Sequence, residues 1–247
     1  MMECKKALEE AGGDLEEAIT NLRKNSVLKA EKKSSRTAVE GIILSKKIDS
    51  ETLFVEVNCE TDFVAKDESF LEFCQQTLEF ACDNKSSHNI FEKVSNGMEE
   101  QRMSLVQKIG ENIKISYFEK ITSENDSVYM YVHSDNKLAS LVHLEKNDDE
   151  LGKDIAMQVS ANAPLAIYPD EIDQQILDKE KEIALATTEN EKKPDEIKEK
   201  IVMGKLKKFK DENSLTEQAF IKNPDSKIKD LLRDNKILGF LRKKVGE

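Results

Sequence analysis

The chain contains no tryptophan, and aromatic side chains make up only 6% of its residues. Its core must therefore be built mainly from Ile, Leu, Val and a few Phe side chains. Cysteine and histidine are also scarce, with 4 and 3 copies. No Cys-x-x-Cys pair occurs, and no histidine stands at ligand spacing from a cysteine, so we expect no disulfide framework, no metal site and no cofactor. No cysteine has the histidine and electropositive surroundings that a nucleophilic thiol needs.

Long apolar runs and clustered positive charge are missing as well. No stretch approaches the roughly 20 apolar residues of a membrane-spanning helix, and residues 1–6 lack the apolar core of a signal peptide. The formal net charge of -11 argues against nucleic-acid binding, because phosphate contacts need clustered Lys and Arg. Only residues 227–247 are locally basic, and acidic residues interrupt them. We therefore predict a cytoplasmic protein without direct nucleic-acid or membrane contacts.

The first 28 residues favour two short helices. Gly12 and Gly13 end the first helix, and Asp14 with Glu17 forms a capping box that begins the second, which we expect over residues 15–24. Residues 29–36 indicate a charged linker. Two helices this short cannot enclose a core, and the apolar helical pattern is already present at the first residue. We therefore expect that a preceding helix is missing.

The middle of the chain predicts two halves, each with a β-hairpin followed by a helix. Turns are expected at Asp49-Ser50 and at Asn136-Lys137. Runs of strands followed by helices favour an α+β fold with antiparallel sheets over a doubly wound fold. We expect strands over residues 38–45, 52–59, 128–133 and 138–144, and one more strand that contains Ile113, Ile115 and Tyr117. We expect three helices: one that starts near Asp67, one over residues 98–109 and one that starts at Glu150.

Residues 172–209 change in character and favour two long helices. Isoleucines at 172, 176 and 183 follow one arm, and a second apolar stripe follows Pro194, which suits the first turn of a helix. The stripes are narrow, which favours an antiparallel hairpin that projects from the body. The alternative is that both helices pack on the body. A short helix over 227–234 and a strand over 237–245 are expected to follow.

One loop stands out from these elements. The period-2 alternation of the second strand stops at Asn58, and Thr61-Asp62-Phe63 follows before the next helix. A large aromatic ring beside a carboxylate is unusual in a connector, and functional residues concentrate in such loops. Two interpretations remain open from these residues. Phe63 is either an exposed functional side chain or a cap folded back on the core.

The same loop carries a family resemblance. Residues 56–66 read Glu-Val-Asn-Cys-Glu-Thr-Asp-Phe-Val-Ala-Lys, which closely resembles a signature of the elongation factor Ts family. We expect the first helix of that family and a helix beyond Glu247 to be missing, and many members have histidine where Gln158 stands. Further matches follow in chain order over residues 1–8, 108–113, 155–159, 207–209 and 239–242.

The resemblance implies an α+β fold with several parts. These are an incomplete helical module of the ubiquitin-associated type (UBA-like, residues 1–28), a linker (29–36), an N-terminal core subdomain (37–121), a C-terminal core subdomain (122–171 and 210–247) and a coiled-coil helical hairpin (172–209).

The resemblance also implies a function, that of a guanine-nucleotide exchange factor for elongation factor Tu. Thr61, Asp62, Phe63 and Val64 would dock near the partner's magnesium site, with Phe63 as a wedge between partner helices and Asp62 as a hydrogen-bonding group. A factor that binds nucleotide-free partner more tightly must weaken nucleotide binding equally, so no enzyme chemistry is implied. Further implied partner contacts are Ile155, Met157, Gln158 and Val159.

Two other functions remain as alternatives. The chain could be an interaction module that docks through its N-terminal helices. It could also be a small hydrolase, although it lacks a phosphate-binding loop, a Gly-x-Ser-x-Gly elbow and a metal cluster.

Overall fold

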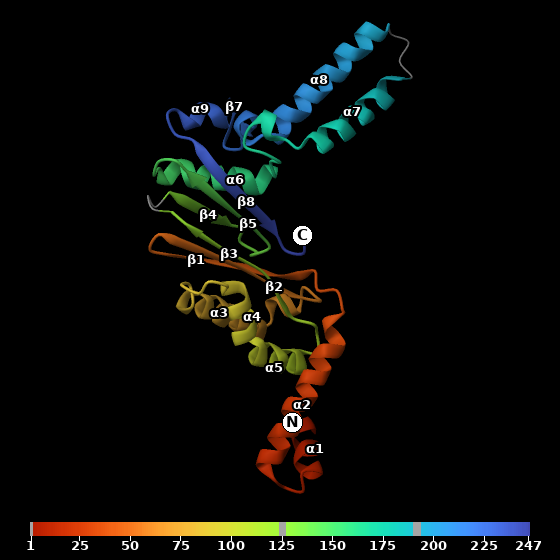
Figure 1. The fold of residues 1–247 in the computed structure, drawn as a ribbon, viewed down its shortest axis with the longest axis vertical. Helices are drawn as coiled ribbons and strands as arrows, with labels where there is room; N and C mark the ends of the chain where they lie inside the picture. The colour runs from red at the N-terminus through yellow and green to blue at the C-terminus, as the bar shows by residue number, and fades with distance from the viewer. Residues whose placement is uncertain (1, 124–126, 190–193) are drawn as a thin grey trace. The chain divides into compact units, whose positions relative to one another are not determined.

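A computed structural model describes residues 2–123, 127–189 and 194–247 (Figure 1). The chain divides into two compact units. Unit 1 comprises Met1–Thr122, Val132–Ala139 and Lys243–Glu247, and unit 2 comprises Ser123–Tyr131 and Ser140–Arg242. Helices combine with small separate sheets, so the expected α+β class is confirmed. None of the helices within the described ranges is long and apolar enough to cross a bilayer.

Unit 1 is built on a three-stranded antiparallel sheet with the order β1-β2-β3. Its strands are β1 (Glu40–Ile48), β2 (Glu51–Cys59) and β3 (Lys114–Thr122). β1 and β2 form the expected hairpin, and the turn residue Asp49 has a left-handed φ of 54°. A β-bulge interrupts the β2–β3 register between Glu56 and Val57. All three strands were expected from the alternation of the sequence.

Three helices cover one face of this sheet in Figure 1: α3 (Glu68–Asp83), α4 (Ile90–Gly97) and α5 (Glu99–Ile109). The sequence predicted α3 and α5 but not α4, which has eight residues, one of them (Val94) buried. Gly97 weakens its helix propensity, yet a Cβ there would lie 2.2 Å from the Phe80 ring. The core of unit 1 consists of apolar residues from these helices and the sheet, among them Leu53, Val55, Val57, Phe70, Phe73, Cys74, Leu78, Val106 and Ile113.

The N-terminal helices are α1 (Met2–Glu10) and α2 (Leu15–Ser34). Asp14 caps α2 and accepts a hydrogen bond from the Glu17 amide, which is one half of the expected capping box, whereas the Asp14 amide donates to the Ala11 carbonyl at 3.0 Å. The expected end of this helix near residue 24 is wrong, and most of the expected linker is helical. No Gly or Pro interrupts residues 15–36, and Ala30 is packed in the core of unit 1, so the burial of that face extends the helix.

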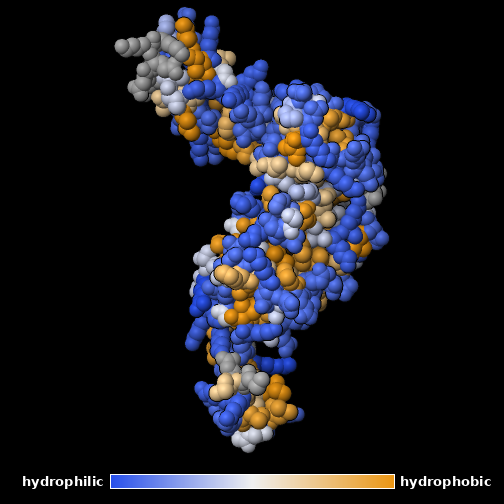
Figure 2. Space-filling view, turned by 180° about the vertical axis from the view of Figure 1, so that it is seen from behind, coloured by the Kyte–Doolittle hydropathy of each residue, from blue (hydrophilic) through white to orange (hydrophobic). Residues whose placement is uncertain are grey.

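α1 and α2 pack on each other through three buried alanines, Ala7, Ala11 and Ala18, with Leu22 beside them. Larger apolar side chains stay exposed on the same two helices: Met2, Leu8, Leu15 and Ile19. Figure 2 shows apolar side chains gathered on the surface of these helices.

Unit 2 contains most of a second sheet with the order β4-β5-β8, formed by β4 (Val128–Val132), β5 (Leu138–Leu144) and β8 (Ile237–Lys244). Helix α6 (Asp149–Asn162) contributes Ile155, Ala156 and Val159 to the apolar core of unit 2, in which they pack with Val142 and Leu144 of β5. The remaining small elements of this unit are η2 (Pro169–Glu171), η3 (Leu215–Glu217), β6 (Ala219–Phe220), β7 (Asn223–Lys227) and α9 (Ile228–Leu232).

Two long helices, α7 (Gln174–Glu189) and α8 (Asp195–Asn213), pack on each other within unit 2. Ala184 of α7 and Val202 of α8 are buried. The Lys205 ammonium donates to the Thr187 hydroxyl at 2.5 Å. Near the start of α7 and the end of α8, a small cluster joins Ala166, Ile172, Leu177 and Phe209. The expected pair of helices is therefore present, and residues 190–193 of the polar segment expected between them lie outside the described residues.

Candidate functional site

The loop between β2 and α3 is a tight, hydrogen-bonded connection. It contains one turn of 3-10 helix, η1 (Val64–Lys66), in which the Lys66 amide donates to the Phe63 carbonyl at 3.2 Å. Asp67 then caps α3, because its carboxylate accepts from the amides of Ser69 at 2.8 Å and Phe70 at 3.3 Å. The loop is thus shaped by its own backbone bonds and by the helix that follows.

The Phe63 side chain is 83% exposed. Val64 is partly buried against the core of unit 1, and Ala65 is buried. The interpretation of Phe63 as a cap on the core is therefore wrong, because the next two residues already occupy that position. The ring is therefore accessible to another molecule.

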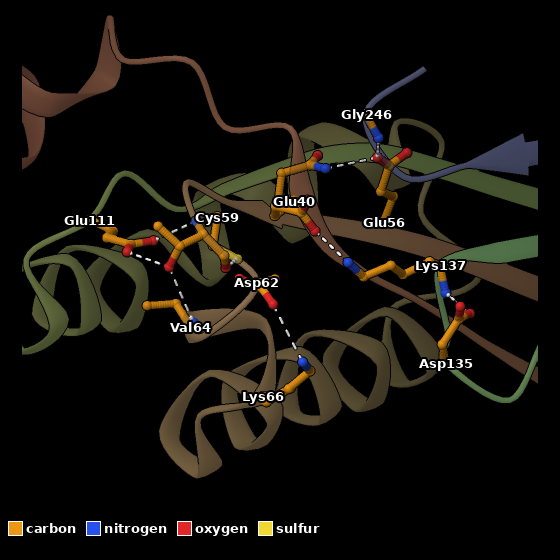
Figure 3. A network of polar contacts seen from close by, with 12 residues as sticks. Glu40, Glu56, Cys59, Asp62, Val64, Lys66, Glu111, Asp135, Lys137 and Gly246 are labelled. Carbon is orange, nitrogen blue, oxygen red and sulfur yellow. Dashed lines mark hydrogen bonds and ion pairs between the residues drawn. The ribbon is translucent and has the colours of Figure 1, made fainter.

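Glu111 anchors the start of the loop, as Figure 3 shows. One of its carboxylate oxygens accepts from the amides of Glu60 and Thr61, both at 3.0 Å, and the other accepts from the Thr61 hydroxyl at 2.7 Å. In return, the Glu60 carboxylate accepts from the Asn112 amide at 2.6 Å. Sequence reasoning did not identify Glu111 as a support of the loop, although it lies within the matching segment 108–113.

Asp62 remains available to a partner. Its carboxylate lies 3.4 Å from the Lys66 ammonium, four residues along the chain, and its side chain is 48% exposed. An exposed ion pair of this kind contributes little to stability. The carboxylate can therefore exchange its lysine contact for a donor on another molecule.

Cys59 supports the loop from the end of β2. Its thiol lies 3.2 Å from the Thr61 carbonyl, to which it donates. Burial, with the Glu111 and Glu40 carboxylates nearby, raises the pKa of the Cys59 thiol to about 12. The thiol is therefore protonated at neutral pH and acts as a buried donor instead of a nucleophile.

The second set of expected partner contacts lies on α6 in unit 2. Ile155 and Val159 belong to the core of that unit. Gln158 is also buried, where its amide nitrogen donates to Gln218 and Ala219 and its oxygen accepts from the Ile221 amide at 2.9 Å. Direct partner contact through these three side chains does not fit their burial. Met157, which is partly exposed, is the member of the set with an accessible side chain.

Comparisons with known proteins agree with the loop signature. The sequence profile of the elongation factor Ts family matches residues 60–247. Elongation factor Ts of Marinobacter nauticus is 48% identical over the whole chain and 86% of the relative's length. This chain belongs to the elongation factor Ts family. The elongation factors Ts of Hahella chejuensis and Saccharophagus degradans are 45% and 43% identical over the whole chain, covering 87% and 86% of those relatives. Membership of this family assigns the chain to translation elongation.

Proposed function

We propose that this chain is a guanine-nucleotide exchange factor for elongation factor Tu. The observation that carries the proposal is the position of Phe63, a ring 83% exposed beside an anchored turn. Aromatic side chains, Phe among them, are enriched at protein interfaces, and a few anchoring side chains carry most of the binding free energy there. The family of the chain supplies the partner.

The proposed mechanism is thermodynamic linkage. Phe63 would enter between helices of the GTPase domain near its magnesium site, and Asp62 would accept a hydrogen bond at the rim of that contact. If the complex is tighter with nucleotide-free partner, GDP must bind more weakly to the complex by the same factor. Release of GDP then lets GTP bind. No bond to substrate is made or broken by this chain in such a cycle, so we class it as a non-enzyme that needs no cofactor of its own.

We further propose roles for the parts of the chain. Residues 1–28 would form a UBA-like module, 29–36 a linker that is mostly helical, and 172–209 a projecting coiled-coil hairpin. The N-terminal core subdomain would cover 37–121, and the C-terminal one 122–171 with 210–247. On α6, Met157 is the proposed surface contact, while Ile155, Gln158 and Val159 would hold that helix in place. We place the protein in the cytoplasm, without direct contact to nucleic acid or membrane.

The docking-module alternative has one specific observation in its favour. Leu8, Leu15 and Ile19 expose 40%, 65% and 45% of their surface on α1 and α2. These side chains suit a protein contact. A module that only docks would bind elongation factor Tu without changing the rate of nucleotide release, so one assay separates the two functions.

The test is release of fluorescent GDP from elongation factor Tu, chased with unlabelled GDP, with and without this chain. We expect the wild-type chain to accelerate release and Phe63→Ala to lose most of the acceleration. Phe91→Ala is the matched control, because Phe91 is another partly exposed phenylalanine of unit 1, 40% exposed on α4. Wild-type binding without acceleration, or equal losses in the two variants, would contradict the proposal.

A further inference from the structure

We propose that Glu111 is a positioning residue for Phe63. The inference rests on the proposed exchange function and adds a residue that acts through Phe63. In this view the Glu111 carboxylate fixes the backbone from which the exposed ring projects. The ring then meets its partner already oriented.

The first step of the argument is that packing does not orient the ring. Phe63 is 83% exposed, so no core contact selects its direction. Its direction depends on the backbone at Thr61, Asp62 and Phe63. An exposed anchor on a loosely held backbone loses conformational entropy on binding, and a preorganised one loses less.

The second step is that Glu111 makes three of the contacts that hold this backbone. Its two oxygens accept from two consecutive amides, those of Glu60 and Thr61, and from the Thr61 hydroxyl. The same hydroxyl oxygen accepts from the Val64 amide at 3.4 Å, beyond the ring. Thr61 therefore links the Glu111 carboxylate to both sides of Phe63. Hydrogen bonds to an ionised carboxylate are stronger than neutral ones.

The third step is that Glu111 is itself held in place. It follows Gly110, which ends α5 in the left-handed conformation with a φ of 92°. The next residue, Asn112, donates its amide to Glu60 and its side chain to the Arg36 carbonyl at 2.8 Å. The carboxylate is thus presented from a fixed turn, and the loop and the turn hold each other through reciprocal bonds.

Without Glu111 the loop keeps weaker supports. The Cys59 thiol is a weak donor to the Thr61 carbonyl, and the Ala65 amide donates to the same carbonyl at 3.2 Å. The freed amides of Glu60 and Thr61 can bond to water instead, because this part of the loop is near solvent. We therefore expect a loop that is still folded but less fixed.

The experiment is a double-mutant cycle on the GDP release rate, with Glu111→Ala, Phe63→Ala and the double variant in the full chain. We expect Glu111→Ala to lower the acceleration by roughly ten- to hundredfold, the scale of a misplaced positioning group. In the Phe63→Ala background the same change should cost less than about twofold, because there is no ring left to orient. Equal losses in both backgrounds would overturn the inference.

Two further variants separate positioning from charge and from folding. Glu111→Gln keeps an oxygen for the two amides and an amide group for the Thr61 hydroxyl oxygen, so it should restore most of the activity lost in Glu111→Ala. Glu79→Gln changes an exposed glutamate on α3 that accepts a hydrogen bond from Gln75 of the same helix, and this variant should behave as wild type. A glutamine variant as inactive as the alanine variant would overturn the inference.

Hydrogen exchange supplies a readout of the loop itself. The Thr61 amide should lose protection in Glu111→Ala while the melting temperature of the protein stays nearly unchanged. Unchanged protection would overturn the inference. Failure of the proposed function looks different, because Phe63→Ala itself would then leave GDP release unaffected.

Discussion

Phe63 and Val64 are neighbours in the chain with opposite environments. The Phe63 ring is 83% exposed, whereas Val64 packs against the core of unit 1. Phe63 is the N-cap of η1 and already has helical backbone angles, with φ of -67° and ψ of -47°, and successive residues of a helical turn point in different directions. Two adjacent residues therefore have different roles: Phe63 is accessible to a partner, and Val64 contributes to the core of unit 1.

This division predicts the stability of two phenylalanine variants. Phe63→Ala should change the free energy of unfolding by less than about 0.5 kcal/mol, the usual range for a surface position. Phe70→Ala, at a fully buried side chain on α3, should cost about 3–5 kcal/mol. Chemical denaturation of the two variants measures the difference. A large loss of stability in Phe63→Ala would contradict this prediction and show that the Phe63 ring packs against the core.

A second prediction concerns Lys243 and Glu56. Glu56 is 2% exposed, and within the described part of the chain one of its oxygens has no hydrogen-bond partner but lies 3.4 Å from the Lys243 ammonium. Removing one partner of a buried ion pair leaves an uncompensated charge and costs about 3–5 kcal/mol. Because the Lys243 side chain is 19% exposed, we expect Lys243→Met to lower the free energy of unfolding by about 3 kcal/mol or less.

The double variant Glu56→Gln with Lys243→Met provides the control, since it removes both charges. It should be more stable than Lys243→Met alone in urea denaturation. If Lys243→Met unfolds at the wild-type urea concentration, the pair contributes nothing to unit 1. In that case solvent reaches the Glu56 carboxylate.

A third prediction concerns pH. Glu217 in η3 accepts from Lys227 at 2.7 Å and from Lys229 at 2.9 Å, and these bonds lower the pKa of its carboxyl group below the usual 4.5. Because the folded pKa is the lower one, the stabilisation is fully present above the usual value and is lost as pH falls through the folded pKa. Glu217→Gln should therefore destabilise the protein at neutral pH but have little effect at strongly acid pH. Melting temperatures across that range measure the effect, and an equal deficit at every pH would contradict it.

A fourth prediction concerns the paired helices α7 and α8. Their contacts are largely with each other, and the cluster around Leu177 and Phe209 forms a natural base. Replacing residues 180–205 with a short Gly/Ser link should therefore leave a cooperatively folded protein with measurable GDP release activity. Circular dichroism melting and the release assay check the two parts. Unfolding of the shortened chain would show that these helices are needed by the body.

The elements that the sequence predicted well have strong local signals. The β1–β2 hairpin follows from alternation around Asp49, and α3 from its apolar face and the Asp67 cap. α4 was missed because it is short and buries one residue. The true end of α2 was missed because it depends on burial of Ala30 against a core assembled from residues far along the chain.

In the candidate site, too, some features could be predicted from local sequence signals and others could not. The composition of the loop indicated function, but exposure of Phe63 could not be read from its residue type, because phenylalanine serves cores and interfaces alike. On α6 the helical pattern was correct, while burial of Gln158 depends on acceptors and donors near residues 218–221. Such contacts between distant segments have no local signal in a sequence.

The bonds of Glu56 also set an order of events for a chain that is made from one end. The Gly246 amide, which donates to the Glu56 carboxylate at 3.0 Å, lies 190 residues further along, and Lys243 is nearly as distant. The strands β1, β2 and β3 are all synthesised long before these two residues. The sheet can therefore form during synthesis while the Glu56 carboxylate is still hydrated. This carboxylate can exchange water for its contacts with Lys243 and Gly246 only after residues 243–246 have emerged from the ribosome. Such non-local closure is slow relative to helix formation, so burial of the Glu56 carboxylate is expected to be a late step in the folding of unit 1.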